Sequence, residues 1–156
     1  MIILLSFLIG IVAGLRAMMA PVLVSWAAYG GLVEIRGGWL EWLGYRFTPW
    51  ILTVAALAEL VTDKLPSTPS RKVPQQFGAR LVSGGLAGAA LASASASGGG
   101  SWIVGLVAGV AGAVVGTLGG AAARTELTRM FGRATPAALV EDLVAVVLGI
   151  AVVLHA

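Results

Sequence analysis

Long apolar stretches alternate with short polar ones along the whole chain. Each apolar stretch is rich in Ala, Val, Leu, Ile and Gly, and most approach the roughly 20 residues that an α-helix needs to cross a bilayer. The alternation predicts an all-α integral membrane protein with about five transmembrane helices in a single membrane domain, residues 1–156. The predicted helices cover residues 2–29, 49–64, 77–96, 102–123 and 136–154.

The first predicted helix, residues 2–29, is longer than a span requires and contains a charge, Arg16. Pro21 removes a helical hydrogen bond and its ring displaces the carbonyl of Ala17, so a kink is expected next to the arginine. Whether the segment is one kinked helix or a broken one is left open. A guanidinium inside an apolar segment is costly and usually faces the bundle interior. Arg16 is therefore expected to pair with an acid, to reach an interface, or to belong to a functional site.

The polar linkers predict the orientation of the helices. The linkers 64–80 and 124–133 are basic, and basic linkers lie on the cytoplasmic side of membranes. The linker 30–48 is crowded with aromatic residues, which favours an outer interface with a short interfacial helix around residues 39–43. Five spans then place the N-terminus in the cytoplasm and the C-terminus outside, in the cell (inner, cytoplasmic) membrane.

Glycines recur every four residues in the third and fourth predicted helices. Such ridges let helix backbones approach closely and predict packing through Gly/Ala faces. The same ridges are compatible with a homo-oligomer, and the sequence does not separate the two arrangements. The glycines are Gly84, Gly88, Gly105, Gly109, Gly112, Gly116 and Gly120.

Composition agrees with a chain surrounded by lipid. The 156 residues are 58% hydrophobic and 11% charged, against about 25% charged residues in soluble domains, and the mean hydropathy is +0.96. The net charge of +3 comes from short basic blocks between apolar segments, so the expected partners are membrane lipids and not nucleic acid. The chain has no cysteine and one histidine, His155, and it lacks a phosphate loop or a metal-binding motif. We therefore predict no enzymatic activity, no metal and no cofactor.

The remaining charges gather at the predicted cytoplasmic ends of the helices. Glu59 and Asp63 lie four residues apart, hence on one face, where like charges require neutralisation. Glu141 shares a stripe with small residues and is expected to face protein, whereas Asp142 points about 100° away, which leaves open whether it reaches the same place. The pattern predicts either a polar site for an ion or an anionic headgroup, or charge pairs that lock helix ends. The candidate substrate- or ion-binding residues are Arg16, Glu59, Asp63, Lys64, Arg80, Arg124, Glu141 and Asp142.

Three motifs carry a family resemblance. They are the opening from Gly14 to Pro21, the central Glu59 with Asp63-Lys-Leu-Pro and Pro69-Ser-Arg, and Gly78-Ala-Arg with Ser83-Gly-Gly. Together they resemble an uncharacterised prokaryotic family of multi-pass membrane proteins that share domain of unknown function 4126. The motifs span about the first 90 residues, and the second half is similar only in hydropathy. The resemblance implies a small multi-helix membrane protein and no established activity.

The charges favour a transporter or channel for an ion or small anion, with a charged site facing the cytoplasm. Arg16, Lys64 and Arg80 would attract an anion, while Glu59 and Asp63 would relay protons or hold a cation. One alternative is a protein that binds or translocates lipid or polyprenyl-phosphate headgroups through its basic rim. Another is a structural or assembly protein in which every embedded charge is paired.

Overall fold

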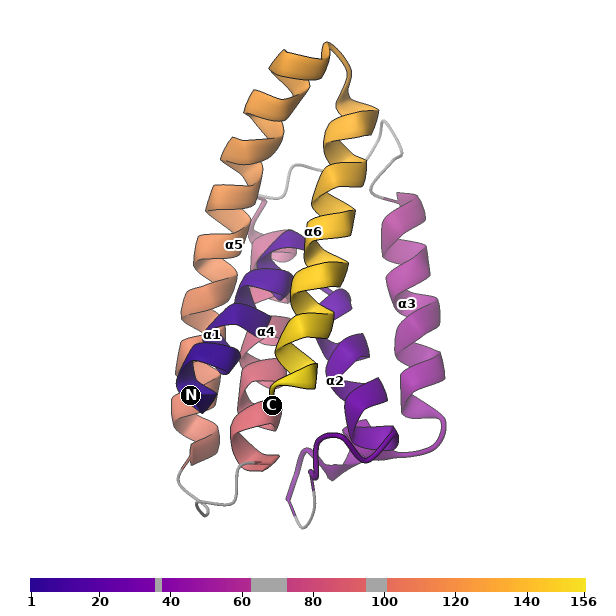
Figure 1. The fold of residues 1–156 in the computed structure, drawn as a ribbon, viewed down its shortest axis with the longest axis vertical. Helices are drawn as coiled ribbons and strands as arrows, with labels where there is room; N and C mark the ends of the chain where they lie inside the picture. Colours follow the sequence, from indigo (N-terminus) through magenta and orange to yellow (C-terminus); the bar gives the residue numbers. More distant parts are fainter. Residues whose placement is uncertain (36–37, 63–72, 95–100) are drawn as a thin grey trace.

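The computed structural model describes residues 1–35, 38–62, 73–94 and 101–156, and every regular element within them is helical. The predicted all-α class is therefore confirmed. Figure 1 shows the helices side by side along one long axis. The elements are α1 (Ile2–Leu15), α2 (Met19–Tyr29), the 3-10 turn η1 (Glu41–Gly44), α3 (Thr48–Thr62), α4 (Pro74–Ala94), α5 (Ser101–Phe131) and α6 (Ala134–Leu154).

The first predicted helix is in fact two helices that run in opposite directions. α1 ends at Leu15, Arg16 takes an extended conformation with φ −141° and ψ 112°, and α2 begins at Met19. Gly149 of α6 lies against both Val12 before the break and Leu23 after it, as expected when the chain doubles back. Figure 1 shows α1 and α2 forming this hairpin, with its apex inside the helical body.

The hairpin corrects the predicted placement of the chain ends. Five antiparallel segments would put the termini at opposite ends, but Figure 1 shows the N- and C-termini at the same end. The physical reason is the extended conformation of Arg16, which turns the chain within its first apolar segment. We call this end of the molecule the termini end, and the end where α5 turns into α6 at Gly132 the Gly132 end.

Glycines bring α1, α4 and α5 into close contact. A Cβ atom on Gly10 or Gly84 would overlap or crowd the Gly109 carbonyl of α5, and one on Gly112 would overlap the Phe7 carbonyl of α1. Gly88 and Gly105 face each other in the same way. The glycine ridges predicted from the sequence therefore serve packing within the chain.

The other boundaries that the structure describes lie within three residues of the prediction, except that α5 is longer than expected. The predicted helix ends at residues 64 and 96 lie outside the described residues. The basic stretch 124–133 was predicted to be a linker, yet α5 continues through it to Phe131. It ends where Gly132 adopts a φ of 65°, a left-handed conformation that glycine accepts at little cost. At the termini end, a short interfacial helix was expected around residues 39–43. The structure has a 3-10 helix there, Glu41–Gly44, and the side chains of Leu40 and Leu43 are buried.

Among the described residues, two helices are long and apolar enough to cross a membrane, α5 from Trp102 onward and α6. The helices α1, α2 and α3 are apolar but shorter. This distribution agrees with the hairpin, since neither α1 nor α2 reaches from one end of the body to the other (Figure 1).

Candidate functional site

The polar side chains predicted to matter converge on the break between α1 and α2. A helix that ends leaves carbonyl groups without partners, and a helix that begins leaves N–H groups without partners. Here both kinds of group lie inside the protein, because Arg16 is only 1% exposed. The break site, as we use the term, consists of residues 16–18 with Glu59, Arg80, Ser83, Thr117 and Asp142.

Glu59 from α3 caps the start of α2. Its two carboxylate oxygens accept hydrogen bonds from the N–H groups of Ala17, at 2.9 Å, and Met18, at 2.8 Å. A carboxylate at this position also interacts favourably with the positive end of the helix dipole. The guanidinium of Arg80 lies 3.9 Å from the same carboxylate.

Arg80 from α4 caps the end of α1. Its Nη1 donates to the carbonyl oxygens of Gly14, at 2.7 Å, and Leu15, at 2.8 Å. The Thr117 hydroxyl of α5 lies 3.3 Å from the same Gly14 carbonyl and 2.7 Å from that of Ala113 in its own helix. A cation at a helix C-terminus complements the negative end of the dipole. Arg80 therefore bridges the end of one half-helix and the carboxylate that caps the other.

Ser83 supplies a hydrogen-bond donor to a backbone carbonyl of the break. Pro21 has no N–H, so it leaves the carbonyl of Ala17 without the donor that a continuous helix would supply. The Ser83 hydroxyl donates to that carbonyl instead. Pro21 was correctly predicted to disturb the helix at Ala17. The Ser83 side chain, from α4, stabilises the break that results.

Arg16 itself reaches α6. Its Nε and Nη2 lie 2.6 and 2.5 Å from one carboxylate oxygen of Asp142. The arginine side chain is 2% exposed and the aspartate side chain 18%. Arg16 therefore pairs with an acid, one of the alternatives left open by the sequence. The sequence left open whether Asp142 reaches the charged cluster, and it does, because the turn at the break directs Arg16 toward α6.

A second pair joins α5 to α6 nearer the Gly132 end. Arg124 lies 3.6 Å from Glu141, whose side chain is 5% exposed. Glu141 faces the protein interior, as its stripe of small residues indicated. The two adjacent acids of α6 thus face different arginines on different helices.

Of the eight candidate residues, six lie in described parts of the chain and take part in these contacts. Asp63 and Lys64 lie outside the described residues. Sequence reasoning missed Ser83 and Thr117 as members of the site. The available signal was a hydroxyl in the middle of an otherwise apolar, small-residue face.

Among the side chains that the structure describes, two arginines of the break site face two carboxylates. The arginines are almost fully buried, while Glu59 and Asp142 are 16% and 18% exposed. In each pair the carboxylate side chain is thus more exposed than the arginine side chain. Within the residues that the structure describes, no three His, Asp or Glu side chains are close enough to hold a metal ion.

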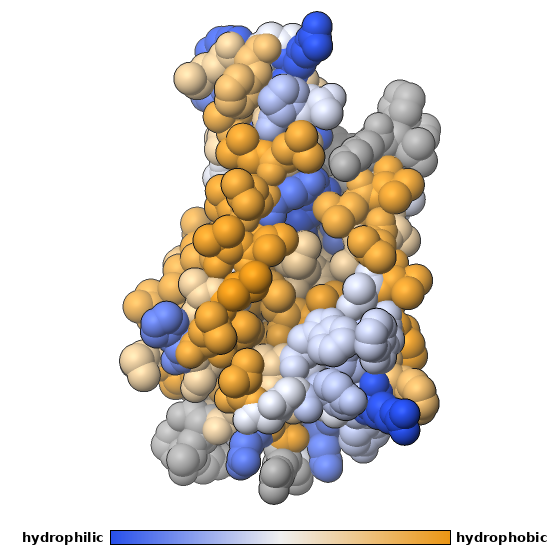
Figure 2. Space-filling view, turned by 45° about the vertical axis from the view of Figure 1, so that its right-hand side comes forward, coloured by the Kyte–Doolittle hydropathy of each residue, from blue (hydrophilic) through white to orange (hydrophobic). Residues whose placement is uncertain are grey.

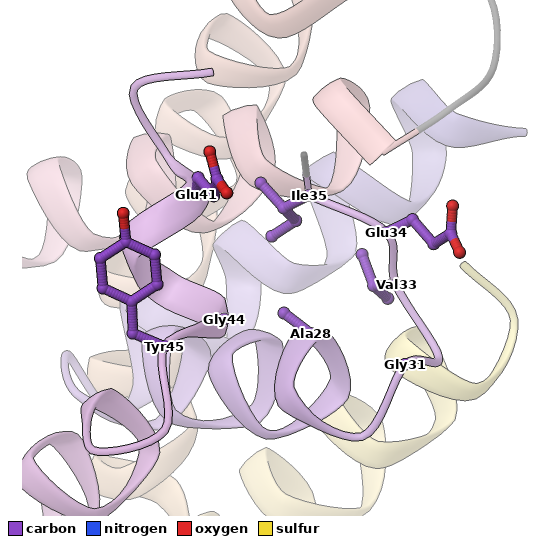
Figure 3. Close-up of a pocket in the computed structure, with 8 residues that line it drawn as sticks. All are labelled: Ala28, Gly31, Val33, Glu34, Ile35, Glu41, Gly44 and Tyr45. Atoms are coloured by element: carbon purple, nitrogen blue, oxygen red, sulfur yellow. The ribbon is translucent and has the colours of Figure 1, made fainter. Parts of the chain in front are cut away.

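A separate pocket of about 190 Å³ opens at the termini end. Figure 3 shows Glu34 and Glu41 on opposite sides of this pocket, with Tyr45 beside Glu41. Both acids come from the polar linker after α2, and neither belongs to the break site. Ala28, Gly31, Val33, Ile35 and Gly44 complete the lining.

Comparison with known proteins gives the chain a family. Residues 3–156 match the family described as Domain of unknown function (DUF4126). No curated protein and no solved structure matches the chain. The match covers nearly all of the sequence, including the second half, which carried no recognisable motif. The chain therefore belongs to the family defined by domain of unknown function 4126.

Proposed function

We propose that this chain is a multi-pass membrane protein that carries a small anion through the break site. The membrane placement is supported by large apolar side chains exposed along the outer faces of α3, α5 and α6. Soluble monomers rarely expose so much contiguous apolar surface. Figure 2 shows apolar surface over most of the middle of one face, with hydrophilic surface toward both ends. Examples are Ile51, Val54, Leu57, Val61, Val107, Val115, Leu118, Leu143, Val147 and Leu154.

In this arrangement α3, α4, α5 and α6 cross the bilayer, and α1 with α2 forms a hairpin that enters from one side and returns. Non-helical backbone is stable at membrane depth only where protein or water satisfies its polar groups. The side chains around residues 16–18 meet that requirement. Four spans and a re-entrant hairpin take the place of five spans.

The orientation follows from the basic residues. Arg124, Arg129 and Arg133 lie toward the Gly132 end, which the positive-inside rule assigns to the cytoplasm. Both chain termini and the aromatic linker then lie outside. The N-terminus therefore takes the opposite side from the one expected for five spans, while the C-terminus keeps its predicted side.

The transport proposal rests on one observation: the break site holds a carboxylate between two backbone N–H groups and a buried arginine. Glu59 is bound there by Ala17, Met18 and Arg80. Broken helices with half-helix ends at the midplane supply the ion sites of many transporters. A site that binds a carboxylate of the protein itself has the chemistry to bind a free anion of similar size.

Charge balance suggests how an anion would replace Glu59. If Glu59 takes up a proton and leaves, the site loses one negative charge beside Arg80. An arriving monovalent anion restores neutrality without movement of the buried guanidiniums. The proposal is therefore movement of a small monovalent anion together with a proton.

A structural role is the second candidate, and a specific observation favours it. Glu59, Arg80 and Ser83 each bond backbone groups that the break would otherwise leave without partners. A lipid-headgroup function has less support, because Arg124 and Arg129 already face Glu141 and Glu126.

Anion permeability of proteoliposomes tests the proposal. Swelling in potassium chloride, nitrate or formate is followed by light scattering, with nigericin to exchange the protons that enter with the anion for potassium. The wild type should swell faster than empty vesicles. Arg80→Lys should lower the rate by about tenfold, equivalent to about 1.4 kcal/mol, because lysine does not present the same planar donors. Glu59→Gln should remove the dependence of the rate on a proton gradient.

Glu126→Gln is the matched control, because Glu126 is an exposed acid paired with Arg129 outside the break site. Each variant is used only if it elutes as a single species in size-exclusion chromatography. A wild type that never exceeds empty vesicles with any of the three anions would leave the structural role as the conclusion.

A further inference from the structure

α3 is the helix least attached to the rest of the protein. Among the described elements it packs only against α2 and η1. Pro49 and Ala56 are its buried residues, and the others are at least partly exposed. By contrast, α1, α4 and α5 meet through backbone contacts between glycines. The protein therefore has a tightly packed body and one peripheral helix.

Two different contacts hold the ends of α3. Near the termini end, the Trp26 indole donates to the Thr53 hydroxyl at 3.0 Å and packs edge-on against Trp50, with ring centroids 5.0 Å apart. Toward the other end, Glu59 reaches the N–H groups of Ala17 and Met18 and the guanidinium of Arg80. Among the described contacts, packing holds the first end and the Glu59 carboxylate holds the second.

Between these two contacts α3 contributes little apolar packing. From Val54 to Thr62 only Ala56 is buried, and Val54, Leu57 and Val61 each expose more than half of their surface. Figure 2 shows hydrophilic surface between two apolar ridges in the upper half of the view. Within the part of the chain that the structure describes, displacing this half of α3 would thus disrupt little apolar packing, and the contacts of Glu59 would be the main loss.

We propose that α3 is a gate that pivots near Trp50 and Thr53, and that the Glu59 carboxylate is the latch that holds it closed over the break site. Release of Glu59 exposes the N–H groups of Ala17 and Met18 from the side of α3. Arg80 keeps its bonds to Gly14 and Leu15, so α1 stays in place while α3 moves. The inference rests on the proposed transport function, because it names what controls access to the same site.

Distances between spin labels test the gate without any transport measurement. The chain has no cysteine, so Val61→Cys with Leu143→Cys labels the latch end of α3 and α6, and Ile51→Cys with Val147→Cys labels the pivot end. All four side chains are more than half exposed. The full-length protein is measured by pulsed electron spin resonance in phosphatidylcholine vesicles.

Glu59→Gln should lengthen and broaden the 61–143 distance by several ångströms and leave the 51–147 distance unchanged. Glu126→Gln, the matched control, should change neither. An unchanged 61–143 distance in Glu59→Gln overturns the gate. Lengthening of both distances also overturns it, because α3 would then detach as a whole. If the gate opens as expected but the wild type conducts no anion, the proposed function fails and the gate stands.

Discussion

Residues 16–18 leave the regular helical ladder, and each of their backbone polar groups has a specific partner. Arg16 donates to Val12 and accepts from Met19, and Met18 accepts from Val22. The remaining groups bind Glu59 and Ser83. Buried backbone groups without partners cost free energy comparable to a lost hydrogen bond. Glu59 of α3 and Arg80 and Ser83 of α4 therefore stabilise the break, and the Thr117 hydroxyl of α5 lies beside the Gly14 carbonyl.

Ser83→Ala should lower the free energy of unfolding by about 1–3 kcal/mol, since it leaves the Ala17 carbonyl buried without a donor. The change is measured by chemical or thermal unfolding in detergent micelles. Ser93→Ala is the matched control on the same helix, because that hydroxyl binds the Ala89 carbonyl one turn earlier. A loss of stability as large for Ser93→Ala as for Ser83→Ala would contradict the assigned role.

At the scale of helices, close packing and the break depend on each other. α1 can approach α4 and α5 because glycines remove the side chains between their backbones. This approach brings the end of α1 to Arg80, which donates to its last two carbonyl groups, and to the Thr117 hydroxyl, which lies 3.3 Å from the first of them. The short Ser6 hydroxyl donates to the Gly88 carbonyl at 3.0 Å along the same contact. Small residues thus let the α1–α2 hairpin approach its neighbours, and charged residues bind the backbone groups at its turn.

Gly109→Ala should destabilise the protein by roughly 1–3 kcal/mol, the usual effect of overpacking. A Cβ there would overlap the Gly84 carbonyl, and neither backbone can yield without separating α4 from α5. Gly119→Ala is the control, because a Cβ at that position meets nothing within 4 Å. It should be neutral or stabilising by up to about 1 kcal/mol, since alanine favours the helix. Equal thermal unfolding midpoints for the two variants would rule out the packing argument.

The helices also show which features of the fold and of the break site could be predicted from the sequence. Hydropathy predicted the cores of α3 to α6, because a long apolar run determines where such a helix lies. It merged α1 with α2, since residues 14–21 are apolar apart from Arg16 and the partners that stabilise the break come from distant parts of the chain. The facing direction of Glu141 was predictable from helical geometry. The pairing of Asp142 was not, because it depends on the turn at Arg16.

At the scale of the whole molecule, the hairpin places both termini on one side. In cells, Ala156→Cys and Leu32→Cys should react with a membrane-impermeant maleimide added outside. Thr125→Cys should react only after the membrane is permeabilised. All three positions are exposed, and the chain has no cysteine to give a background signal. Labelling of Thr125→Cys in intact cells would invert the proposed orientation.

The pairing of Arg16 with Asp142 has a consequence for biosynthesis. The two residues are separated by 126 positions, so the ribosome completes α1 and α2 long before α6 exists. During that interval Arg16 lacks the Asp142 carboxylate, and a guanidinium in hydrocarbon is costlier when part of its compensating charge is missing. In the proposed membrane arrangement, the hairpin is therefore expected to settle in the bilayer after translation of α6, and chains truncated before Asp142 should be preferred substrates for membrane quality control.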